Sequence, residues 1–212
     1  MRGADGTGAN TMGVRTTIER YNGVAMALHW AIAAAVMGLA ASGLWMVTAI
    51  KEPATQAQAF AVYQWHKSLG LTVLVLMVAR LIWRLAKPPP ALPASLPAHE
   101  KAMAHAAHWS LYVLLIAVPI LGWAMVSASV YGLPTIRFGL FEWPHLPVLP
   151  GLADKKPVED ALRWLHGTAA YAVIAIVGVH ILAVLKHEVM DADGGVVTRM
   201  LPGGDSKKGE KA

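Results

Sequence analysis

Histidine is the residue type in this chain that offers the most chemistry, because it occurs nine times while cysteine does not occur at all. The absence of cysteine excludes disulfides, thiolate-bound zinc, iron–sulfur clusters and haem attached covalently through C-x-x-C-H. Imidazole binds transition metals and haem iron, and it exchanges protons near neutral pH. The sequence therefore points to metal binding, haem binding or proton transfer through histidine.

Two of these histidines, His166 and His180, lie fourteen residues apart in one apolar stretch. Fourteen residues of α-helix make almost four turns, so both side chains leave nearly the same face, at levels about 21 Å apart. In an antiparallel bundle, His29 falls near the depth of His180, and His66 falls near the depth of His166. Each of two levels in a membrane would then hold two imidazoles from different helices.

Four apolar stretches are long enough to cross a bilayer, which needs about 20 mostly apolar residues in helical form. They are expected at about 24–50, 56–84, 109–130 and 164–185. Of all residues 56% are hydrophobic and only 15% are charged, and the mean hydropathy is +0.47. This composition excludes a disordered chain and an ordinary soluble domain. It predicts an all-α membrane protein, a bundle of four transmembrane helices.

Lysine and arginine predict how this bundle is oriented. With four spans both termini lie on one side, and that side would hold twelve of the eighteen Lys and Arg residues, which places it in the cytoplasm. We expect a cytoplasmic tail at 1–20, a membrane domain at 21–202 and a cytoplasmic tail at 203–212. The first tail lacks an apolar core, so no cleavable signal peptide is expected. The net charge of +5 then indicates topology and contact with anionic lipid rather than nucleic acid binding.

The connections between the expected spans differ in composition. Residues 87–100 contain five prolines and are expected to form a stiff cytoplasmic linker. Residues 131–163 form the longest loop, which is expected on the outer side. An apolar patch in that loop consists of Phe138, Leu140, Phe141 and Trp143, and it could lie on the membrane surface. His99 and His145 are expected in these two connections and receive no role.

Two imidazoles at each of two levels suit either metal transport or haem. Zinc or copper pathways usually add Asp, Glu, Cys or Met ligands, and the four expected spans contain no carboxylate. Haem b takes axial histidines, lies in an apolar slot between helices and needs no covalent attachment. Glycines in or beside the spans could admit a flat macrocycle or simply allow close helix packing. These glycines are Gly38, Gly43, Gly70, Gly122, Gly167 and Gly178.

Arg80 and Arg84 lie four residues apart and therefore share a face at the inner end of the second expected span. They could neutralise the propionates of an inner haem. They could equally be ordinary arginines whose side chains extend toward the cytoplasmic surface. The sequence leaves both interpretations open.

Several spaced motifs carry a resemblance to a known family. They are Tyr21-Asn22-Gly23-Val24-Ala25-Met26-Ala27-Leu28-His29-Trp30, His66-Lys67-Ser68-Leu69-Gly70, Arg80-Leu81-Ile82-Trp83-Arg84, Ala104-His105-Ala106-Ala107-His108, Pro119-Ile120-Leu121-Gly122 and Trp164-Leu165-His166-Gly167, with His180 further on. Together they resemble the bacterial cytochrome b561 family, over about residues 20–202. The resemblance implies a four-helix inner-membrane cytochrome that encloses two non-covalent b-type haems and exchanges electrons with ubiquinone.

The resemblance also implies roles for single residues. The axial ligands would be His29 with His180 for the inner haem, and His66 with His166 for the outer haem. His105 and His108 would line the inner haem or the quinone without being ligands. His187 matches a histidine near the inner quinone pocket of the family, and we expect it to accept a proton from ubiquinol. Lys186 beside it is polar where the family pattern is often apolar.

On this resemblance the protein is a quinone-linked oxidoreductase of the bacterial inner membrane. Electrons would pass from ubiquinol through both haems to an acceptor at the periplasmic face, and flow in the reverse direction stays open. The partner there would be superoxide or oxygen, or a soluble electron carrier such as a cytochrome. Lys67, Lys155, Lys156 and Arg163 lie on that side and could steer an anion, or could be ordinary loop residues.

Two other functions remain open from the sequence. The chain could be the cytochrome b anchor subunit of a larger respiratory dehydrogenase, of the hydrogenase or formate dehydrogenase type. Its short outer loops favour a protein that works alone. The chain could also be a histidine-lined metal transporter, which would contain no haem.

Overall fold

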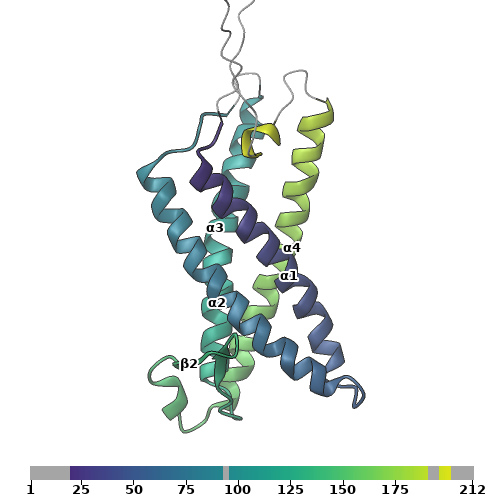
Figure 1. Ribbon diagram of the computed structural model, residues 1–212, viewed down its shortest axis with the longest axis vertical. Coiled ribbons are helices and arrows are strands. Elements are labelled where there is room, and N and C mark those ends of the chain that lie inside the picture. The colour runs from purple at the N-terminus through teal and green to yellow at the C-terminus, as the bar shows by residue number, and fades with distance from the viewer. Residues whose placement is uncertain (1–19, 93–95, 191–195, 202–212) are drawn as a thin grey trace, which may run out of the picture.

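The computed structural model describes residues 20–92, 96–190 and 196–201, so all of the two expected tails except Arg20 lies outside the described residues. Four long helices run up and down in sequence order, as Figure 1 shows. They are α1 (Gly23–Ala49), α2 (Gln56–Ala86), α3 (Ala98–Ser127) and α4 (Lys156–Met190). Each of them is long and apolar enough to cross a membrane. The predicted four-helix membrane architecture is therefore confirmed.

The last two helices are longer than their apolar runs. α3 has 30 residues and α4 has 35, which makes them about 45 and 52 Å long, against about 30 Å of hydrocarbon. An apolar run marks only the part of a helix that meets lipid, and the polar turns on either side continue the helix. The expectation that His99 lies in the linker was therefore wrong, because His99 is the second residue of α3. The expected outer loop likewise ends at Lys155 rather than at Arg163.

Each helix packs against the next one in the chain, whereas α1 and α4 have little backbone contact. The buried apolar core lies at mid-height and consists of Ile32, Val36, Val73, Met77, Tyr112 and Val173. Only 6–17% of the most apolar window of each helix is buried inside the protein. The remaining apolar surface therefore needs lipid around it, as expected for a membrane bundle.

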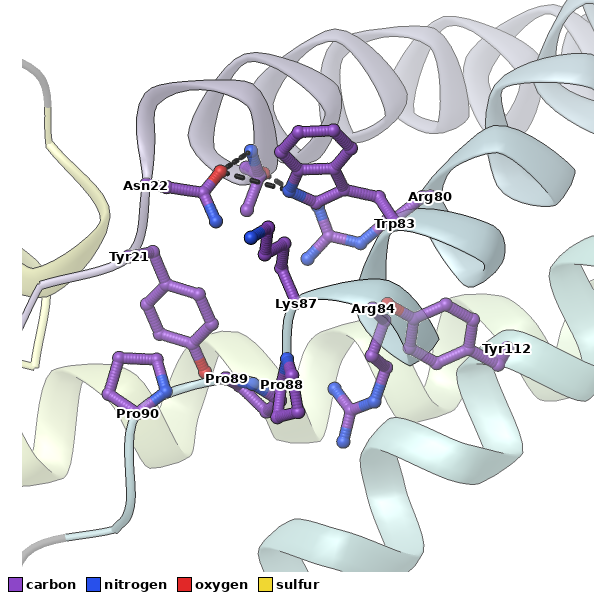
Figure 2. Close-up of a pocket in the computed structure, with 11 residues that line it drawn as sticks. Tyr21, Asn22, Arg80, Trp83, Arg84, Lys87, Pro88, Pro89, Pro90 and Tyr112 are labelled. Atoms are coloured by element: carbon purple, nitrogen blue, oxygen red, sulfur yellow. Dashed lines mark hydrogen bonds between the residues drawn. The ribbon is translucent and has the colours of Figure 1, made fainter.

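The start of α1 and the last described residues lie together at one end of the bundle, where the Tyr21 N–H donates to the Arg199 carbonyl at 3.1 Å, and we call this the terminal end (Figure 1). The short helical turn η2 (Thr198–Met200) packs there on the start of α1, and the Trp30 indole donates a hydrogen bond to the Met200 carbonyl at 2.7 Å. Asn22 caps α1, because its side-chain oxygen accepts the Ala25 N–H at 2.9 Å. The same oxygen accepts the Trp83 indole N–H at 3.0 Å, as Figure 2 shows, and so ties α1 to the end of α2.

A small hairpin marks the opposite end, which we call the hairpin end. Its strands β1 (Thr135–Arg137) and β2 (Phe141–Trp143) are antiparallel, and Ile136 pairs with Glu142. The hairpin lies on α2, where the buried Ser68 hydroxyl accepts the Phe138 N–H at 3.0 Å. Lys67 Nζ donates to the Pro134 carbonyl at 3.0 Å. These contacts hold the hairpin over the turn of α2 that contains His66.

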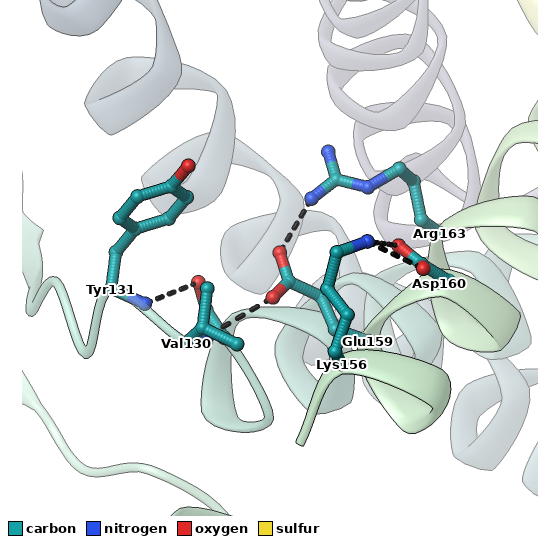
Figure 3. A network of polar contacts seen from close by, with 7 residues as sticks. Val130, Tyr131, Lys156, Glu159, Asp160 and Arg163 are labelled. Atoms are coloured by element: carbon teal, nitrogen blue, oxygen red, sulfur yellow. Dashed lines mark hydrogen bonds and ion pairs between the residues drawn. The ribbon is translucent and has the colours of Figure 1, made fainter. Parts of the chain in front are cut away.

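Glu159, in the first turn of α4, is the buried charge that joins α4 to the end of α3 (Figure 3). Its Oε2 accepts the Val130 N–H at 3.0 Å, and its Oε1 lies 2.5 Å from Arg163 Nη2. Lys156 and Asp160 form a second ion pair on the same helix, but both of those side chains are exposed. The buried carboxylate therefore satisfies a backbone donor just beyond α3, which the exposed pair does not do.

Replacing Glu159 by alanine should destabilise the bundle by about 1–3 kcal/mol, because the Val130 N–H and the Arg163 guanidinium lose their shared acceptor. Asp160→Ala is the matched control and should cost about 0.3–0.5 kcal/mol, as for an exposed ion pair on a helix. Unfolding of the detergent-solubilised protein measures both losses. Equal losses for the two variants would show that Glu159 does not hold the two helices together.

Candidate functional site

Residues from all four helices meet at two levels, because each helix carries a residue of interest at two positions fourteen residues apart. The level nearer the terminal end, the terminal level, holds His29, Arg80, His108 and His180. The level nearer the hairpin end, the hairpin level, holds Gly43, His66, Gly122 and His166. The two positions on each helix are almost four turns, or about 21 Å, apart. Half-way between them lie Val36, Val73, Leu115 and Val173, which form part of the apolar core or pack against it.

At the hairpin level the rings of His66 on α2 and His166 on α4 approach each other. Their centroids lie 6.5 Å apart, and the ring planes are inclined by 76°. Two imidazoles that bind one metal ion from opposite sides, through bonds of about 2 Å, have nitrogens about 4 Å apart and centroids about 6 Å apart. The pair therefore fits the donor set and the separation that one haem iron requires.

Both of these imidazoles are held by their Nδ1 atoms. His166 Nδ1 lies 3.0 Å from the Val118 carbonyl oxygen, which can only accept a hydrogen bond. His66 Nδ1 lies 3.0 Å from the Ser42 hydroxyl oxygen, and that hydroxyl donates its own proton to the Leu39 carbonyl. In each case Nδ1 is the donor, which leaves the lone pair on Nε2 for a metal. This arrangement of ring and outer partner is typical of metal-bound histidine.

Two glycines make room for these rings. A Cβ atom on Gly122 would lie 3.0 Å from His166 Cε1, and one on Gly43 would lie 3.3 Å from His66 Cε1. Both distances are shorter than ordinary van der Waals contact, so the rings reach their partners only because the side chains are absent. A Cβ on Gly70 would meet nothing within 4 Å. Gly43 and Gly122 therefore admit the histidines themselves, which the sequence did not suggest.

At the terminal level three histidines and one arginine gather. The ring centroids of His108 and His180 lie 5.6 Å apart. His29 lies within electrostatic reach of Arg80, His180 and His108, and its ring packs edge-on against Trp30. The predicted partners His29 and His180 therefore lie at one depth, and His108 joins them as a third imidazole.

The two histidines that were expected to open the third span lie inside α3. His108 is partly buried and bonds to the backbone of Ala104, one turn earlier. His105 is exposed, and none of the contacts found in the described residues brings it to either level. Its expected place beside a cofactor or quinone therefore remains a prediction.

A small basic pocket lies at the terminal end, as Figure 2 shows. Arg80, Arg84 and Lys87 line it together with aromatic residues and the prolines of the linker, and no carboxylate is among its described lining residues. Arg80 Nη1 donates to the Ala25 carbonyl at 2.9 Å, and the Arg84 guanidinium lies 5.3 Å from the centre of the Tyr112 ring. The pocket therefore has an excess of positive charge that suits an anionic group.

His187, which was expected just beyond the fourth span, lies in the last turn of α4. Its Nε2 lies 3.5 Å from Oε2 of Glu100, which belongs to the first turn of α3. Glu100 Oε1 lies 2.6 Å from Lys186 Nζ. The structure thus joins His187 to a carboxylate that the sequence did not single out.

The sequence contained a pattern that could have identified the missed carboxylate Glu159. Glu159, His166, Val173, His180 and His187 follow one another at seven-residue intervals, which put them along one face of α4. Glu100 does not belong to a comparable pattern of regularly spaced residues on α3. It is found only because the ends of α3 and α4 meet.

The described part of the chain contains no group of three or more His, Cys, Asp or Glu side chains that could hold a metal ion. This finding includes the terminal level, where three histidines come together. The close imidazole pairs in the described residues are His66 with His166 and His108 with His180, whose ring centroids lie 6.5 and 5.6 Å apart.

Comparison with known proteins gives this arrangement a family context. The family model described as prokaryotic cytochrome b561 matches residues 20–203. Cytochrome b561 homolog 2 of Escherichia coli (strain K12) is 34% identical over 190 residues, which cover 90% of this chain and 95% of that relative. The protein named "Probable superoxide oxidase CybB" of Yersinia pestis is 34% identical over 138 residues, which cover 65% of this chain and 73% of that relative.

Replacing Gly122 by alanine should displace the His166 ring, because the new Cβ would lie 3.0 Å from Cε1 and 3.2 Å from Nδ1. We expect loss of about half of the bound haem, measured as haem per polypeptide in the purified protein. Gly70→Ala is the matched control, since a Cβ there meets nothing within 4 Å. Full haem content in Gly122→Ala would mean that haem binding does not depend on the space that Gly122 leaves for the His166 ring.

Proposed function

Because this chain belongs to the prokaryotic cytochrome b561 family of bacterial multi-pass membrane cytochromes, we propose that it carries electrons between ubiquinol and an acceptor at the opposite face of the membrane. The family implies b-type haem as the electron carrier. The observation that carries the proposal is the repeated spacing of fourteen residues, which brings imidazoles of different helices together at two levels about 21 Å apart.

We assign His66 with His166, and His29 with His180, as the axial pairs of two non-covalent haems. The first pair is supported by its 6.5 Å separation and by the two engaged Nδ1 atoms. The second pair is supported by shared depth, since His29 lies within electrostatic reach of His180. It also lies on α1 and α4, which have little contact, as helices separated by a flat cofactor would. Haem held by these pairs would supply one-electron transfer rather than oxygen binding.

The basic pocket supports a role for Arg80 and Arg84 in binding the propionates of the terminal-level haem. Arg80 belongs to that level, and Arg84 lies one turn closer to the terminal end. We assign His108 to the surroundings of the same haem, because its ring centroid lies 5.6 Å from that of His180. Its imidazole bonds to the backbone of Ala104 on its own helix. It is the family resemblance, rather than this contact, that gives the ligand role to His29 instead.

We place ubiquinol oxidation at the terminal end, with His187 as the proton acceptor. This imidazole is only 17% exposed, and it lies seven residues beyond His180 on the same face of α4. Imidazole is a side-chain type that can both accept and release the protons of quinol oxidation. The positive-inside rule puts this end, which holds Arg80, Arg84 and Lys87, in the cytoplasm together with both termini.

The acceptor side would then be the hairpin end, at the periplasmic face. The relative whose printed name is a superoxide oxidase supports superoxide as the partner there, with a soluble electron carrier as the other possibility. Of the cations expected to steer an anion, Lys156 is paired with Asp160 and Arg163 is paired with Glu159. Steering would therefore depend mainly on Lys67 and Lys155.

Haem content tests the two axial pairs. The purified wild type should give a b-type absorption band in a dithionite-reduced minus oxidised spectrum, with two haems per chain. His66→Ala and His180→Ala should each keep about half of the haem, because each removes one ligand of a different pair. His145→Ala, in the loop before α4, is the control and should keep both haems.

If both histidine variants kept two haems, the assigned pairs would be wrong. A wild type without the reduced band would remove the cytochrome function and would favour the metal transporter. A large subunit that co-purifies with the protein would favour the anchor-subunit function instead.

The electron donor tests the direction of flow. Ubiquinol added to the oxidised protein should reduce the haem within seconds if electrons enter at the terminal end. Superoxide from a generating system should do the same if they enter at the hairpin end, and Lys67→Gln should then slow reduction several-fold at low salt. Reduction by dithionite alone, with neither donor active, would contradict the proposed exchange with quinone.

A further inference from the structure

The face of α4 that carries His166 and His180 continues to the terminal end of the bundle. The seven-residue spacing brings His187 onto this face in the last turn of the helix. Seven residues are close to two turns, so the face drifts by only about 20° per step. His187 is therefore the point at which this row of imidazoles meets the membrane surface.

Glu100 meets His187 from the first turn of α3. Its Oε2 lies 3.5 Å from His187 Nε2, while its Oε1 is held by Lys186 Nζ at 2.6 Å and has His99 Nε2 at 4.0 Å. The Glu100 and His187 side chains are 21% and 17% exposed, whereas His99 is 74% exposed. The pair is thus partly buried between two helices and still reaches water.

Both members of the pair suit the helix ends on which they lie. The N-terminus of α3 favours the negative carboxylate of Glu100, and the C-terminus of α4 favours a positive charge on His187. A carboxylate beside an imidazole holds the ring in one orientation and neutralises the charge that the ring gains with a proton. Because Lys186 fixes Oε1, the other oxygen stays turned toward the imidazole.

We propose that Glu100 positions His187 for proton transfer from ubiquinol, and that the pair delivers the proton to water at the terminal end. This inference rests on the proposed oxidation of ubiquinol. In each one-electron step one quinol O–H bond breaks, the proton bonds to His187, and the electron leaves to the one-electron carrier of the cytochrome. Two such steps yield quinone, two protons and two electrons, and His187 loses each proton to water by way of Glu100.

The test uses the haem-loaded protein in detergent and measures its reduction by ubiquinol in H2O and in D2O. Glu100→Ala should lower the limiting rate constant of haem reduction by about tenfold or more, with a change of less than about twofold in the ubiquinol concentration that gives half of the limiting rate. The solvent isotope effect should rise, because proton transfer becomes rate-limiting. Glu100→Gln should lie between wild type and Glu100→Ala, since its amide oxygen can still orient the imidazole.

Glu188→Gln is the matched control, because it removes a neighbouring carboxylate whose Oε2 accepts the Val197 N–H. It should keep the limiting rate constant of haem reduction and the isotope effect of the wild type. Wild-type values in Glu100→Ala would overturn the proposal. Should that variant fail to fold, wild-type values in Glu100→Gln would overturn it equally.

The failure of the proposed function is distinguishable from the failure of this inference. If dithionite reduces the wild type but ubiquinol does not, the proposed reaction with quinol is itself excluded. If ubiquinol reduces the wild type and both Glu100 variants at the same rate, only the role of Glu100 is excluded.

Discussion

An imidazole inside a membrane bundle must have its ring nitrogens satisfied, since an unpaired polar group in hydrocarbon costs several kcal/mol. Much of the hairpin level follows from this constraint. The Val118 carbonyl and the Ser42 hydroxyl accept from Nδ1 of His166 and His66, and the missing side chain of Gly122 lets the first of these rings reach its acceptor. With Nδ1 engaged in both rings, Nε2 is the atom that would bind the iron of the proposed haem, and that bond would satisfy the second nitrogen of each ring.

The two levels are fourteen residues apart on every helix, but the residues that form them differ in chemistry. Where the hairpin level has Gly43 and Gly122, the terminal level has His29 and His108 on the same helices, and Arg80 takes the position that His66 has at the hairpin level. Only the terminal level therefore offers cations and spare imidazoles, and it lies near the Glu100–His187 pair. This difference suits an end that exchanges both protons and electrons with quinol, opposite an end that exchanges electrons alone.

The connections at the hairpin end hold the helices in the register that the two levels need. Ser68 and Lys67 fasten the hairpin to α2 directly beside His66. Glu159 fastens the start of α4 to the turn after α3, two helical turns before His166. The small apolar core alone would leave the helices free to slide, because apolar packing in lipid has no strong preference for one register.

The sequence by itself determined the four membrane helices, the two histidine levels and the family resemblance, because apolar length and the spacing of side chains along one helix are local properties. It also identified His29, His66, His166 and His180 as the residues that share depths. Only the tertiary structure decided that Gly43 and Gly122 leave space for the histidine rings, that His108 joins the terminal level and that Glu100 contacts His187. Those contacts join different helices, and their geometry depends on crossing angles and on rotation of each helix about its axis, which no single segment specifies.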